Sequence, residues 1–261
     1  MSELTILFLL LGSFSGFVAG LLGIGGGLII VPVLLYLLAP SIDQSFLMHT
    51  SIGTALAVIV FTSISSLYAH HRHGAILWRN FVKLTPTILL GSYSGAILAK
   101  YLSFDFLRVF FALFEICVAL IMWFGISASG HADKLSRWVW SFAGYVIGLI
   151  SAMVGIGGGT MTTPFLVYNN IQIKNAIATS AAVGMPIAIA GSIGFMVAGS
   201  SQVLQTGGIG FVNFEALITI AVSSVFFAPL GAKVTHLIDS NKLKKGFSIF
   251  LAFLAAMVIL F

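Results

Sequence analysis

Charged side chains are scarce in this sequence. Of its 261 residues, 12 are Lys or Arg and 7 are Asp or Glu, so that 7% are charged, whereas a soluble domain has roughly 25%. In contrast, 59% of the residues are hydrophobic, and the mean hydropathy is +1.11. A soluble domain of this size has too small an interior to hide that much apolar surface from water. The composition therefore excludes a soluble globular enzyme and predicts a protein embedded in a lipid bilayer.

Cysteine is also rare, and familiar catalytic motifs are missing. The single cysteine, Cys117, has no partner for an internal disulfide. No His-Glu-x-x-His motif occurs, and no Gly-Lys-Ser/Thr follows the glycine runs, which argues against a zinc hydrolase and a P-loop. The stretch His70–His73 is basic and is better interpreted as a solvated loop than as a metal site. We therefore expect no enzyme activity, no metal, no cofactor and no ATP-driven transport.

The sequence consists largely of long apolar runs with few charged residues. Most reach the 18 or more residues that indicate a membrane-spanning helix, and the short alternating strands of a β-barrel are not seen. The runs lie at about 4–38, 46–69, 81–102, 106–126, 138–167, 176–198, 214–238 and 243–261. The sequence predicts an all-α polytopic membrane protein that forms a single transmembrane domain over residues 1–261.

The first and fifth runs are unusually long and contain an internal repeat. Gly16–Leu34 reads GFVAGLLGIGGGLIIVPVL and Gly148–Leu166 reads GLISAMVGIGGGTMTTPFL, with eight of 19 positions identical. Weaker matches follow in the same order: Thr50-Ser51 resembles Thr179-Ser180, and Asn80-Phe81 resembles Asn213-Phe214. We therefore expect two repeats, over residues 1–127 and 136–261, joined by the most polar stretch of the chain.

Basic residues between the runs predict how the chain crosses the membrane. The net charge of +5 is interpreted as this topology signal and not as a nucleic-acid surface. If both glycine-rich runs are hairpins, only Lys100 and Arg108 of the 12 basic residues fall on the outer side. Eight single crossings would divide them five against seven. Since basic residues gather in the cytoplasm, hairpins are favoured. The repeats are then inverted, each with a glycine-broken hairpin plus three spanning helices, giving 8–10 helical segments and both termini outside.

The glycine runs themselves predict broken helices. Gly23–Gly27 and Gly155–Gly159 each hold four glycines in five residues, and each glycine costs about 1 kcal/mol inside a helix. Broken backbone at membrane depth is tolerated where it is buried or lines a wet cavity. The half-helix that follows points its first N–H groups at the break, which suits an anion. Close packing through small residues is the alternative, but two equivalent copies favour a transporter site. Pro32 and Pro164 are interpreted as kinks that support the breaks.

Hydroxyl groups are divided unequally between the two repeats. The apolar residues Leu28–Val31 correspond to Thr160–Thr163, which add three hydroxyls to the second hairpin. A hydroxyl can donate to an anion without a buried cation; the alternative is a bond to its own helix. Together with the Thr-Ser pairs, the candidate substrate ligands are Gly25, Gly26, Gly27, Thr50, Ser51, Thr54, Gly157, Gly158, Gly159, Thr160, Thr163, Thr179 and Ser180.

Two titratable residues are candidates for coupling. Glu115 is the only acidic residue well inside an apolar run, and a carboxyl group in the bilayer is a functional hypothesis by default. It either relays protons or is protonated and bonded to a neighbour; its counterpart in the second repeat is Leu251. His49 can change charge near neutral pH, and a solvated histidine at the interface is the alternative. Gly91 and Gly95 have the spacing of a helix-packing motif.

The doubled glycine-proline segments, each followed by a Thr-Ser pair, resemble the TauE/SafE family, also called the sulfite exporter or sulfonate-uptake permease family. The family's motifs correspond here to Gly23–Gly27 with Pro32, to Gly155–Gly159 with Pro164, and to the two Thr-Ser pairs. The resemblance covers nearly the whole chain. It implies a secondary transporter of small sulfur-containing anions, such as sulfite, sulfoacetate or related organosulfonates, in a bacterial inner membrane. It gives no precedent for a role of Glu115.

These observations together predict alternating access to one site. The expected partners are a small anionic substrate held between the two hairpins, the lipid bilayer, a coupling proton or cation, and a second copy of the chain in a homodimer. The alternative is a non-transporting membrane scaffold or a subunit of a larger complex. Such a scaffold would not need two broken hairpins with converging polar groups.

Overall fold

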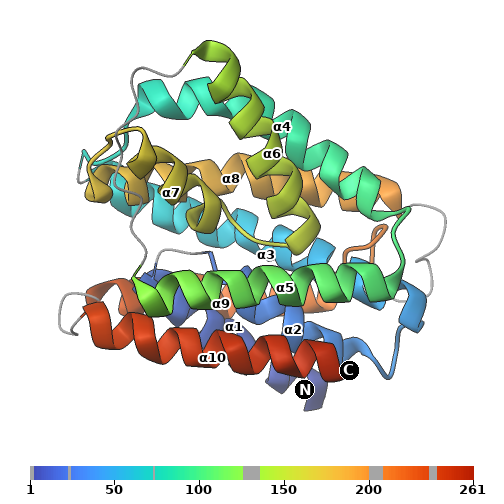
Figure 1. The fold of residues 1–261 in the computed structure, drawn as a ribbon. Helices are drawn as coiled ribbons and strands as arrows, with labels where there is room; N and C mark the ends of the chain where they lie inside the picture. Colours follow the sequence, from blue (N-terminus) through green and yellow to red (C-terminus); the bar gives the residue numbers. More distant parts are fainter. Residues whose placement is uncertain (1–2, 23–24, 73, 126–135, 200–207, 235–239) are drawn as a thin grey trace.

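The computed structural model describes residues 3–22, 25–72, 74–125, 136–199, 208–234 and 240–261. Over these ranges the chain forms ten helices and no strand (Figure 1). The helices are α1 (Glu3–Leu22), α2 (Gly27–Leu38), α3 (Gln44–Arg72), α4 (Trp78–Ala99), α5 (Phe104–Phe124), α6 (Arg137–Val154), α7 (Gly159–Tyr168), α8 (Ile173–Ala198), α9 (Phe214–Val234) and α10 (Ser240–Leu260). The predicted all-α fold is confirmed, and each apolar run corresponds to one helix or to a broken pair.

Helix lengths separate spanning helices from half-helices. Seven helices in the described part of the chain are long and apolar enough to cross a membrane: α1, α3, α4, α5, α6, α8 and α9. In contrast, α2 has 12 residues and α7 has 10. At 1.5 Å per residue they extend about 18 and 15 Å, roughly half of a hydrocarbon core. Each unusually long run is therefore a long helix followed by a half-helix, with the glycines between them.

Local signals explain where several helices begin and end. The Ser103 hydroxyl accepts a hydrogen bond from the Phe106 N–H at 3.2 Å at the start of α5, and Ser136 has the same role at the start of α6. Such caps satisfy the N–H groups that a helix start leaves free. Gly125 ends α5 with φ of 62°, a left-handed conformation that suits glycine.

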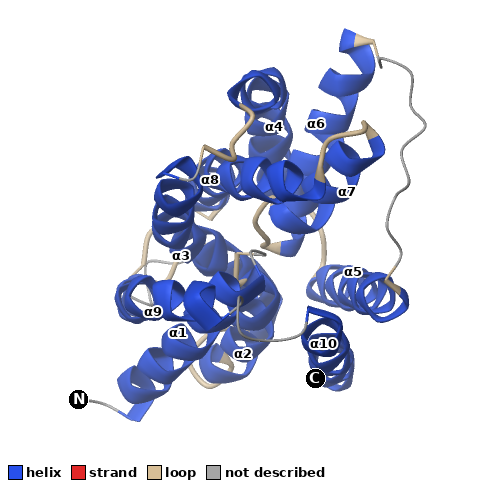
Figure 2. Cartoon of the chain, turned by 90° about the vertical axis from the view of Figure 1, so that its left-hand side faces the viewer, coloured by secondary structure: helices blue, strands red, loops and turns tan. Residues whose placement is uncertain are grey.

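Helices α3 and α8 form the centre of the bundle. In their most apolar windows 83% and 67% of the residues are buried, against 33 to 39% in the other five spanning helices. Figure 2 shows α3 and α8 between a group that holds α1, α2 and α9 and another that holds α4, α6 and α7. Helices α5 and α10 form a separate pair at one side. Helix α3 contacts α2 and α9 of the first group and α6 of the second, and α8 contacts α3 and the second group, α4, α6 and α7.

The helix contacts follow the order of the repeat. The first helix of each half packs mainly against the fourth helix of the other half, so α1 lies against α9 and α6 lies against α4. Likewise α3 contacts α9 while α8 contacts α4, and the half-helices α2 and α7 contact α3 and α8. Each half thus completes its packing with helices of the other half. The inversion of the repeats relative to a membrane stays a prediction.

Glycines allow the helices of two pairs, α4 with α6 and α1 with α9, to approach each other closely. A side chain added at Gly91 or Gly95 of α4 would meet the carbonyl oxygens of Tyr145 and Leu149 on α6. In the equivalent pair, one added at Gly16 of α1 would meet the backbone of Ser224 on α9. Backbones that approach this closely leave no room for a Cβ. The packing function expected of Gly91 and Gly95 is confirmed.

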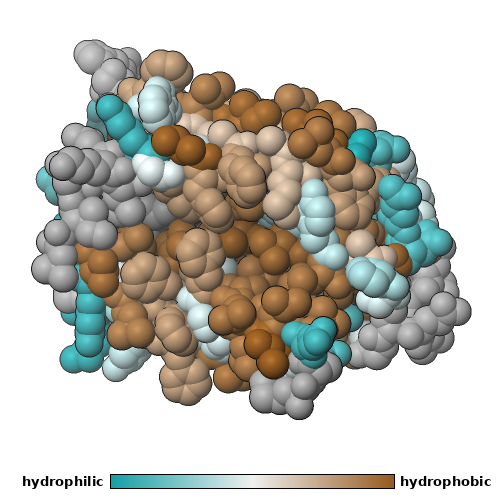
Figure 3. All heavy atoms as spheres, turned by 90° about the horizontal axis from the view of Figure 1, so that it is seen from below, coloured by the Kyte–Doolittle hydropathy of each residue, from teal (hydrophilic) through white to brown (hydrophobic). Residues whose placement is uncertain are grey.

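The outer surface is mainly apolar. Figure 3 shows hydrophilic side chains mostly at the left and right edges, which are the ends of the long helices in Figure 1, with a broad hydrophobic face between them. Large side chains such as Leu90, Phe226 and Phe253 are 66, 72 and 63% exposed. Outer faces of this kind suit contact with lipid rather than with water.

Candidate functional site

Glycines in the left-handed region form both helix breaks. Gly155 ends α6 with φ of 76°, and its N–H donates to the carbonyl of Ser151 at 3.0 Å. Gly25 and Gly26 precede α2 with φ of 82° and 75°. An L side chain at these positions would be strained. The backbone breaks predicted at the glycine runs are confirmed for these residues, while Gly23 and Ile24 lie outside the described residues.

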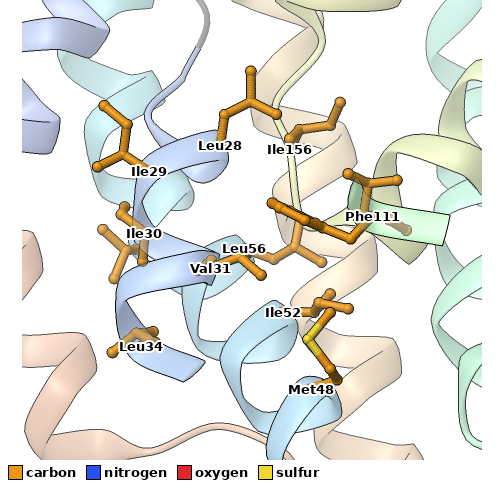
Figure 4. Packing of buried hydrophobic residues seen from close by; sticks show 14 of the residues in the cluster. Leu28, Ile29, Ile30, Val31, Leu34, Met48, Ile52, Leu56, Phe111 and Ile156 are labelled. Carbon is orange, nitrogen blue, oxygen red and sulfur yellow. The ribbon is translucent and has the colours of Figure 1, made fainter. Parts of the chain in front are cut away.

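The two breaks touch each other in the interior of the bundle. A Cβ built on Gly25 would lie 3.4 Å from Cα of Gly157. One built on Gly27 would overlap the carbonyl oxygen of Gly155. Figure 4 shows Leu28, in the first turn of α2, facing Ile156 of the second break. Segments about 130 residues apart therefore meet, as the repeat led us to expect.

Helix α8 packs against the second break at Gly158. A Cβ on Gly158 would lie 2.7 Å from the carbonyl oxygen of Ser180 and 3.0 Å from the backbone nitrogen of Gly184. Because both atoms belong to the backbone of a central helix, they have little freedom to move aside. Gly158 is thus tightly enclosed at the start of α7.

Four of the predicted hydroxyls already have partners that join helices. Thr54 accepts a hydrogen bond from the Asn213 N–H at 2.9 Å, and Thr179 accepts one from the Leu77 N–H at 3.0 Å. The hydroxyls of Thr163 and Ser180 lie 2.6 Å apart, and Ser180 donates to the carbonyl of Ile177 at 2.9 Å. These groups fasten the central helices to their neighbours. Their contact with a substrate stays a prediction.

Other hydroxyls near the second break are buried and without a partner. Within the described ranges, no hydrogen bond reaches the side-chain oxygens of Thr50, Ser51, Ser151, Thr160 and Thr162. All of these except Thr160 are completely buried residues. An unsatisfied buried polar group costs about 1–3 kcal/mol, and such groups are uncommon. These five groups are therefore able to bind a ligand or water, and whether they contact a substrate stays a prediction.

These five hydroxyls come from segments that meet at the second break. Ser151 is in the last turn of α6, where its carbonyl accepts from the N–H groups of Gly155 and Ile156 at 3.0 Å each. Thr160 and Thr162 are in the first turn of α7. On α3, Thr50 and Ser51 directly precede Ile52, whose Cα lies 3.3 Å from a Cβ built on Gly155. The hydroxyls of Ser151, Thr160 and Thr162 thus belong to the segments in which α6 stops and α7 begins, while those of Thr50 and Ser51 belong to the turn of α3 that precedes Ile52.

The start of α7 adds backbone donors to these hydroxyls. The first bond of this helix joins the Thr162 N–H to the carbonyl of Gly158 at 3.0 Å. A helix leaves its preceding N–H groups without an internal partner, and they carry partial positive charge. Here those groups belong to Gly159, Thr160 and Met161. Amides and hydroxyls together can bind an anion without a fixed positive charge.

The first break differs because its first turn is apolar. Leu28, Ile29, Ile30 and Val31 are 0 to 1% exposed and belong to the main hydrophobic core. Figure 4 shows these side chains around the first turns of α2, next to Ile52 and Leu56 of α3. The polar side of the junction is therefore formed by α6, α7 and the start of α3. The two hairpins thus differ in polarity at the junction, and the binding of substrate by the second hairpin stays a prediction.

Two of the five hydroxyls were missing from the predicted ligand set. Ser151 corresponds to Ala19 in the first repeat, and Thr162 corresponds to Ile30. The signal that would have found them is the same one that found Thr160, namely a hydroxyl where the other repeat is apolar. Pro32 and Pro164 lie inside α2 and α7, which continue beyond them, and a kink at either residue stays a prediction.

His49 is buried, so the expectation of a solvated histidine at the interface is wrong. Only 3% of the residue is exposed. Its Nε2 lies 2.9 Å from the carbonyl oxygen of Ala99, and its ring packs on Phe211 at a centroid distance of 5.0 Å. The ring is held between the end of α4 and the segment before α9, because α3 runs through the centre of the bundle.

Glu115 lies in the middle of the buried face of α5. It is completely buried, and neither carboxyl oxygen has a hydrogen-bond partner in the described part of the chain. The neighbour expected for a structural carboxyl group is therefore missing here. In the histidine-rich stretch, His71 is exposed and packs edge-on against Trp78, while His73 lies outside the described residues. The described residues contain no group of three potential metal ligands.

Comparisons with known proteins agree with this architecture. A probable membrane transporter protein of Haemophilus influenzae is 38% identical over 254 residues, which cover 96% of each chain. One of Methanocaldococcus jannaschii is 27% identical, with 91% of this chain and 89% of the relative covered. The YdhB protein of Bacillus subtilis, also named a probable membrane transporter, is 27% identical over 88% of this chain and 90% of its own. No solved structure matches the chain.

The match to a protein family is nearly complete in length. The family described as Sulfite exporter TauE/SafE matches residues 8–258, which include both glycine breaks and all ten helices in whole or in part. This is a family of membrane transporters and not of enzymes. On the strength of this match and of the Haemophilus relative, the chain belongs to the sulfite exporter TauE/SafE family of membrane transporters.

Proposed function

We propose that this protein is a secondary transporter of a small sulfur-containing anion, such as sulfite, sulfoacetate or a related organosulfonate. It carries the anion across the bacterial inner membrane, with both termini outside. The observation that carries the proposal is the junction of the two glycine breaks, where the hydroxyls of Ser151, Thr160 and Thr162 have no partner in the described ranges. The family description, which names a sulfite exporter, supports the sulfur-containing class.

The chemistry of the junction suits a sulfonate. A sulfonate has three acceptor oxygens and spreads its charge over them, so it needs several donors more than it needs one cation. The first-turn amides of α7 and the hydroxyls of Ser151, Thr160 and Thr162 supply donors on one side. Donors of this kind bind without the cost of burying a Lys or Arg. The apolar first turn of α2 covers the other side.

The short half-helices suit alternating access. Because α2 and α7 extend only about half of a hydrocarbon core, the junction at their starts lies at membrane depth rather than at a surface. Paired interrupted helices at equivalent places in two halves are a recurrent feature of transporter sites. Rocking of one half against the other would open the junction first to one side and then to the other. A proton or cation gradient would drive the cycle.

Thermal stabilisation tests this proposal directly. The purified protein is heated with sulfite, thiosulfate, sulfoacetate, taurine, sulfate, acetate or phosphate, since a ligand that binds the folded state raises its melting temperature. We expect a shift with a sulfonate or with sulfite that Gly158→Leu abolishes. The control is Gly246→Leu, because a Cβ at Gly246 meets nothing within 4 Å.

A second variant distinguishes loss of anion binding from loss of folding. Thr162→Val keeps the volume of the side chain and removes only a hydroxyl that has no partner in the described chain. It should fold and should bind the anion more weakly. Stabilisation by no anion, or a shift that Gly158→Leu and Thr162→Val both leave unchanged, would contradict the proposed site and would favour a scaffold function.

A further inference from the structure

Helix α5 buries a single stripe of residues, and an acid stands at its centre. The stripe contains Phe104, Leu107, Phe111, Glu115 and Val118, whose spacing of three or four residues places them on one helix face. This face lies against α10, with further contacts to α3 and α6. All other large side chains of the stripe are apolar. Glu115 is therefore an exception in an otherwise uniform hydrophobic contact.

The fold itself does not need an acid at this position. Glu115 is completely buried, and within the described residues its two oxygens have no hydrogen-bond partner. In the second half, the corresponding residue of α10 is Leu251, which is also completely buried. A leucine thus satisfies the same kind of contact without an unpaired polar group. An unpaired buried carboxyl group destabilises a protein. We therefore expect Glu115 to have a function other than packing.

No charged side chain among the described residues pairs with Glu115 in this conformation. On α5 itself, Arg108 is seven residues away, about 10 Å along the axis, and it pairs with Asp105 at 2.9 Å. On α3, His49 lies beside Ala99, near the opening turn of α5. The other charged groups with described side chains on packed helices are Lys245 of α10, over the ring of Trp123 at 5.8 Å, and the exposed His71 and Arg72 of α3 and Arg137 of α6. These helices also carry His70, Lys242 and Lys244, whose side chains lie outside the described part of the structure. An ionised carboxylate so placed would be unpaired, so Glu115 holds a proton here.

The stripe that buries Glu115 shares one hydrophobic cluster with the glycine junction. Phe111 lies one turn before Glu115 on the same helix face. Phe111 belongs to the same cluster of buried hydrophobic residues as Ile156, which is part of the second break, and Leu56 of α3 (Figure 4). A movement that opens the junction to one side must therefore shift the contact that covers this stripe. Opening of the anion site and exposure of Glu115 to water are thus mechanically linked.

We infer that Glu115 carries the coupling proton and that the protein moves one proton together with each anion. The inference rests on the proposed function. When the junction is open to one side, the carboxylate takes a proton from water there and becomes a neutral acid. The acid is buried during the transition, as in this structure. When the junction opens to the other side, the O–H bond breaks and the proton returns to water with the anion.

Proteoliposomes test this inference with two kinds of transport. Wild-type protein and the Glu115→Gln variant are reconstituted with the membrane potential clamped at zero, and uptake of 35S-labelled sulfite and sulfoacetate is followed. A gradient of one pH unit, alkaline inside, should concentrate the anion about tenfold for one coupled proton. Exchange of labelled for unlabelled anion, without a gradient, needs no net proton release. The Glu115→Gln variant mimics the protonated acid. It should no longer accumulate the anion in response to the pH gradient, but it should still exchange labelled for unlabelled anion.

The outcomes separate the inference from the proposed function. The control is Glu215→Gln, which removes an exposed carboxylate from the start of α9 and should behave as wild type. Wild-type exchange without any effect of the pH gradient would overturn proton coupling and leave the proposed function standing. Loss of both activities in Glu115→Gln would make the residue structural and would also overturn it. If wild-type protein exchanges neither anion, the proposed function fails and the coupling fails with it.

Discussion

The two glycine breaks share a motif and differ in chemistry. Both interrupt a long apolar run, both precede a half-helix, and their backbones touch each other. Yet the first turn after one break buries Leu28 and Ile30 in the core, whereas the turn after the other carries Thr160 and Thr162, whose hydroxyls lack partners among the described residues. The comparison shows that glycine provides the shape of the junction, and that the side chains of one half provide its polarity.

The largest effect is expected where the two breaks touch. A leucine at Gly27 would force its Cβ against the carbonyl oxygen of Gly155, and backbone that is enclosed in this way cannot yield. Gly27→Leu should lower the free energy of unfolding by about 3 kcal/mol or more, or prevent assembly. Size-exclusion chromatography and thermal unfolding of the purified variant measure this, with Gly246→Leu as control. A variant as stable as wild type would disprove the contact.

Removing a free hydroxyl from the polar break should change binding and stability in opposite directions. Thr162→Val takes away a buried group that has no described partner, so the free energy of unfolding should stay equal or rise. The binding free energy of the anion should weaken by about 1.5–3 kcal/mol, the range for hydrogen bonds to charged groups. Titration calorimetry and thermal unfolding give the two values. A drop in stability with unchanged affinity would show that the hydroxyl is structural.

The reciprocal change in the apolar break sharpens the same comparison. Ile30 is 1% exposed and occupies the position of Thr162 in the first repeat. Ile30→Thr buries a hydroxyl with no partner and should lower the free energy of unfolding by about 1–3 kcal/mol more than Ile30→Val does. We expect no gain in anion affinity, because no described helix start supplies hydroxyls on that side. Tighter binding by Ile30→Thr would mean that both breaks hold the substrate.

Two hydrogen bonds join the central helices to neighbouring segments, one from the central helix of each half, and their loss should destabilise the protein to a similar extent. Thr54→Val leaves the Asn213 N–H without its acceptor, and Thr179→Val does the same to the Leu77 N–H. Each should lower the free energy of unfolding by about 1–3 kcal/mol, the cost of a donor left unsatisfied, with Thr179→Val toward the lower end because the Leu77 N–H is only partly buried. Thermal unfolding of both variants tests this. A difference of more than about twofold between them would show that the halves are fastened unequally.

The smallest effect is expected at Thr163. Its hydroxyl pairs with that of Ser180, which keeps its own bond to the carbonyl of Ile177 when Thr163 is changed. Thr163→Val should lower the free energy of unfolding by about 0.5–1.5 kcal/mol and weaken anion binding less than Thr162→Val does. Titration calorimetry and thermal unfolding of Thr163→Val and Thr162→Val show which substitution has the larger effect. A larger loss of affinity at Thr163 would place the substrate on the α8 side of the half-helix.

Much of the fold could be predicted because its causes are local. Hydropathy over about 20 residues determines which segments become spanning helices, and four glycines in five residues determine where a helix stops. For example, the apolar run at 214–238 became α9 (Phe214–Val234), and the run at 138–167 became α6 and α7. The internal repeat also indicated which two segments would meet. Burial of His49 was not predictable, because it depends on α3 being central.

The amino-acid sequence alone is enough to predict a bundle of apolar helices with two glycine breaks, and hydroxyls in the first turn after the second break only. These properties arise from the composition of short segments. Only the tertiary structure decided which hydroxyls are free. Thr54 and Asn213 are 159 residues apart, and Thr179 and Leu77 are 102 apart, so no local pattern distinguishes these bonded threonines from Thr50 or Thr160. A hydrogen bond requires two groups within about 3 Å, and the packing of distant helices sets that distance.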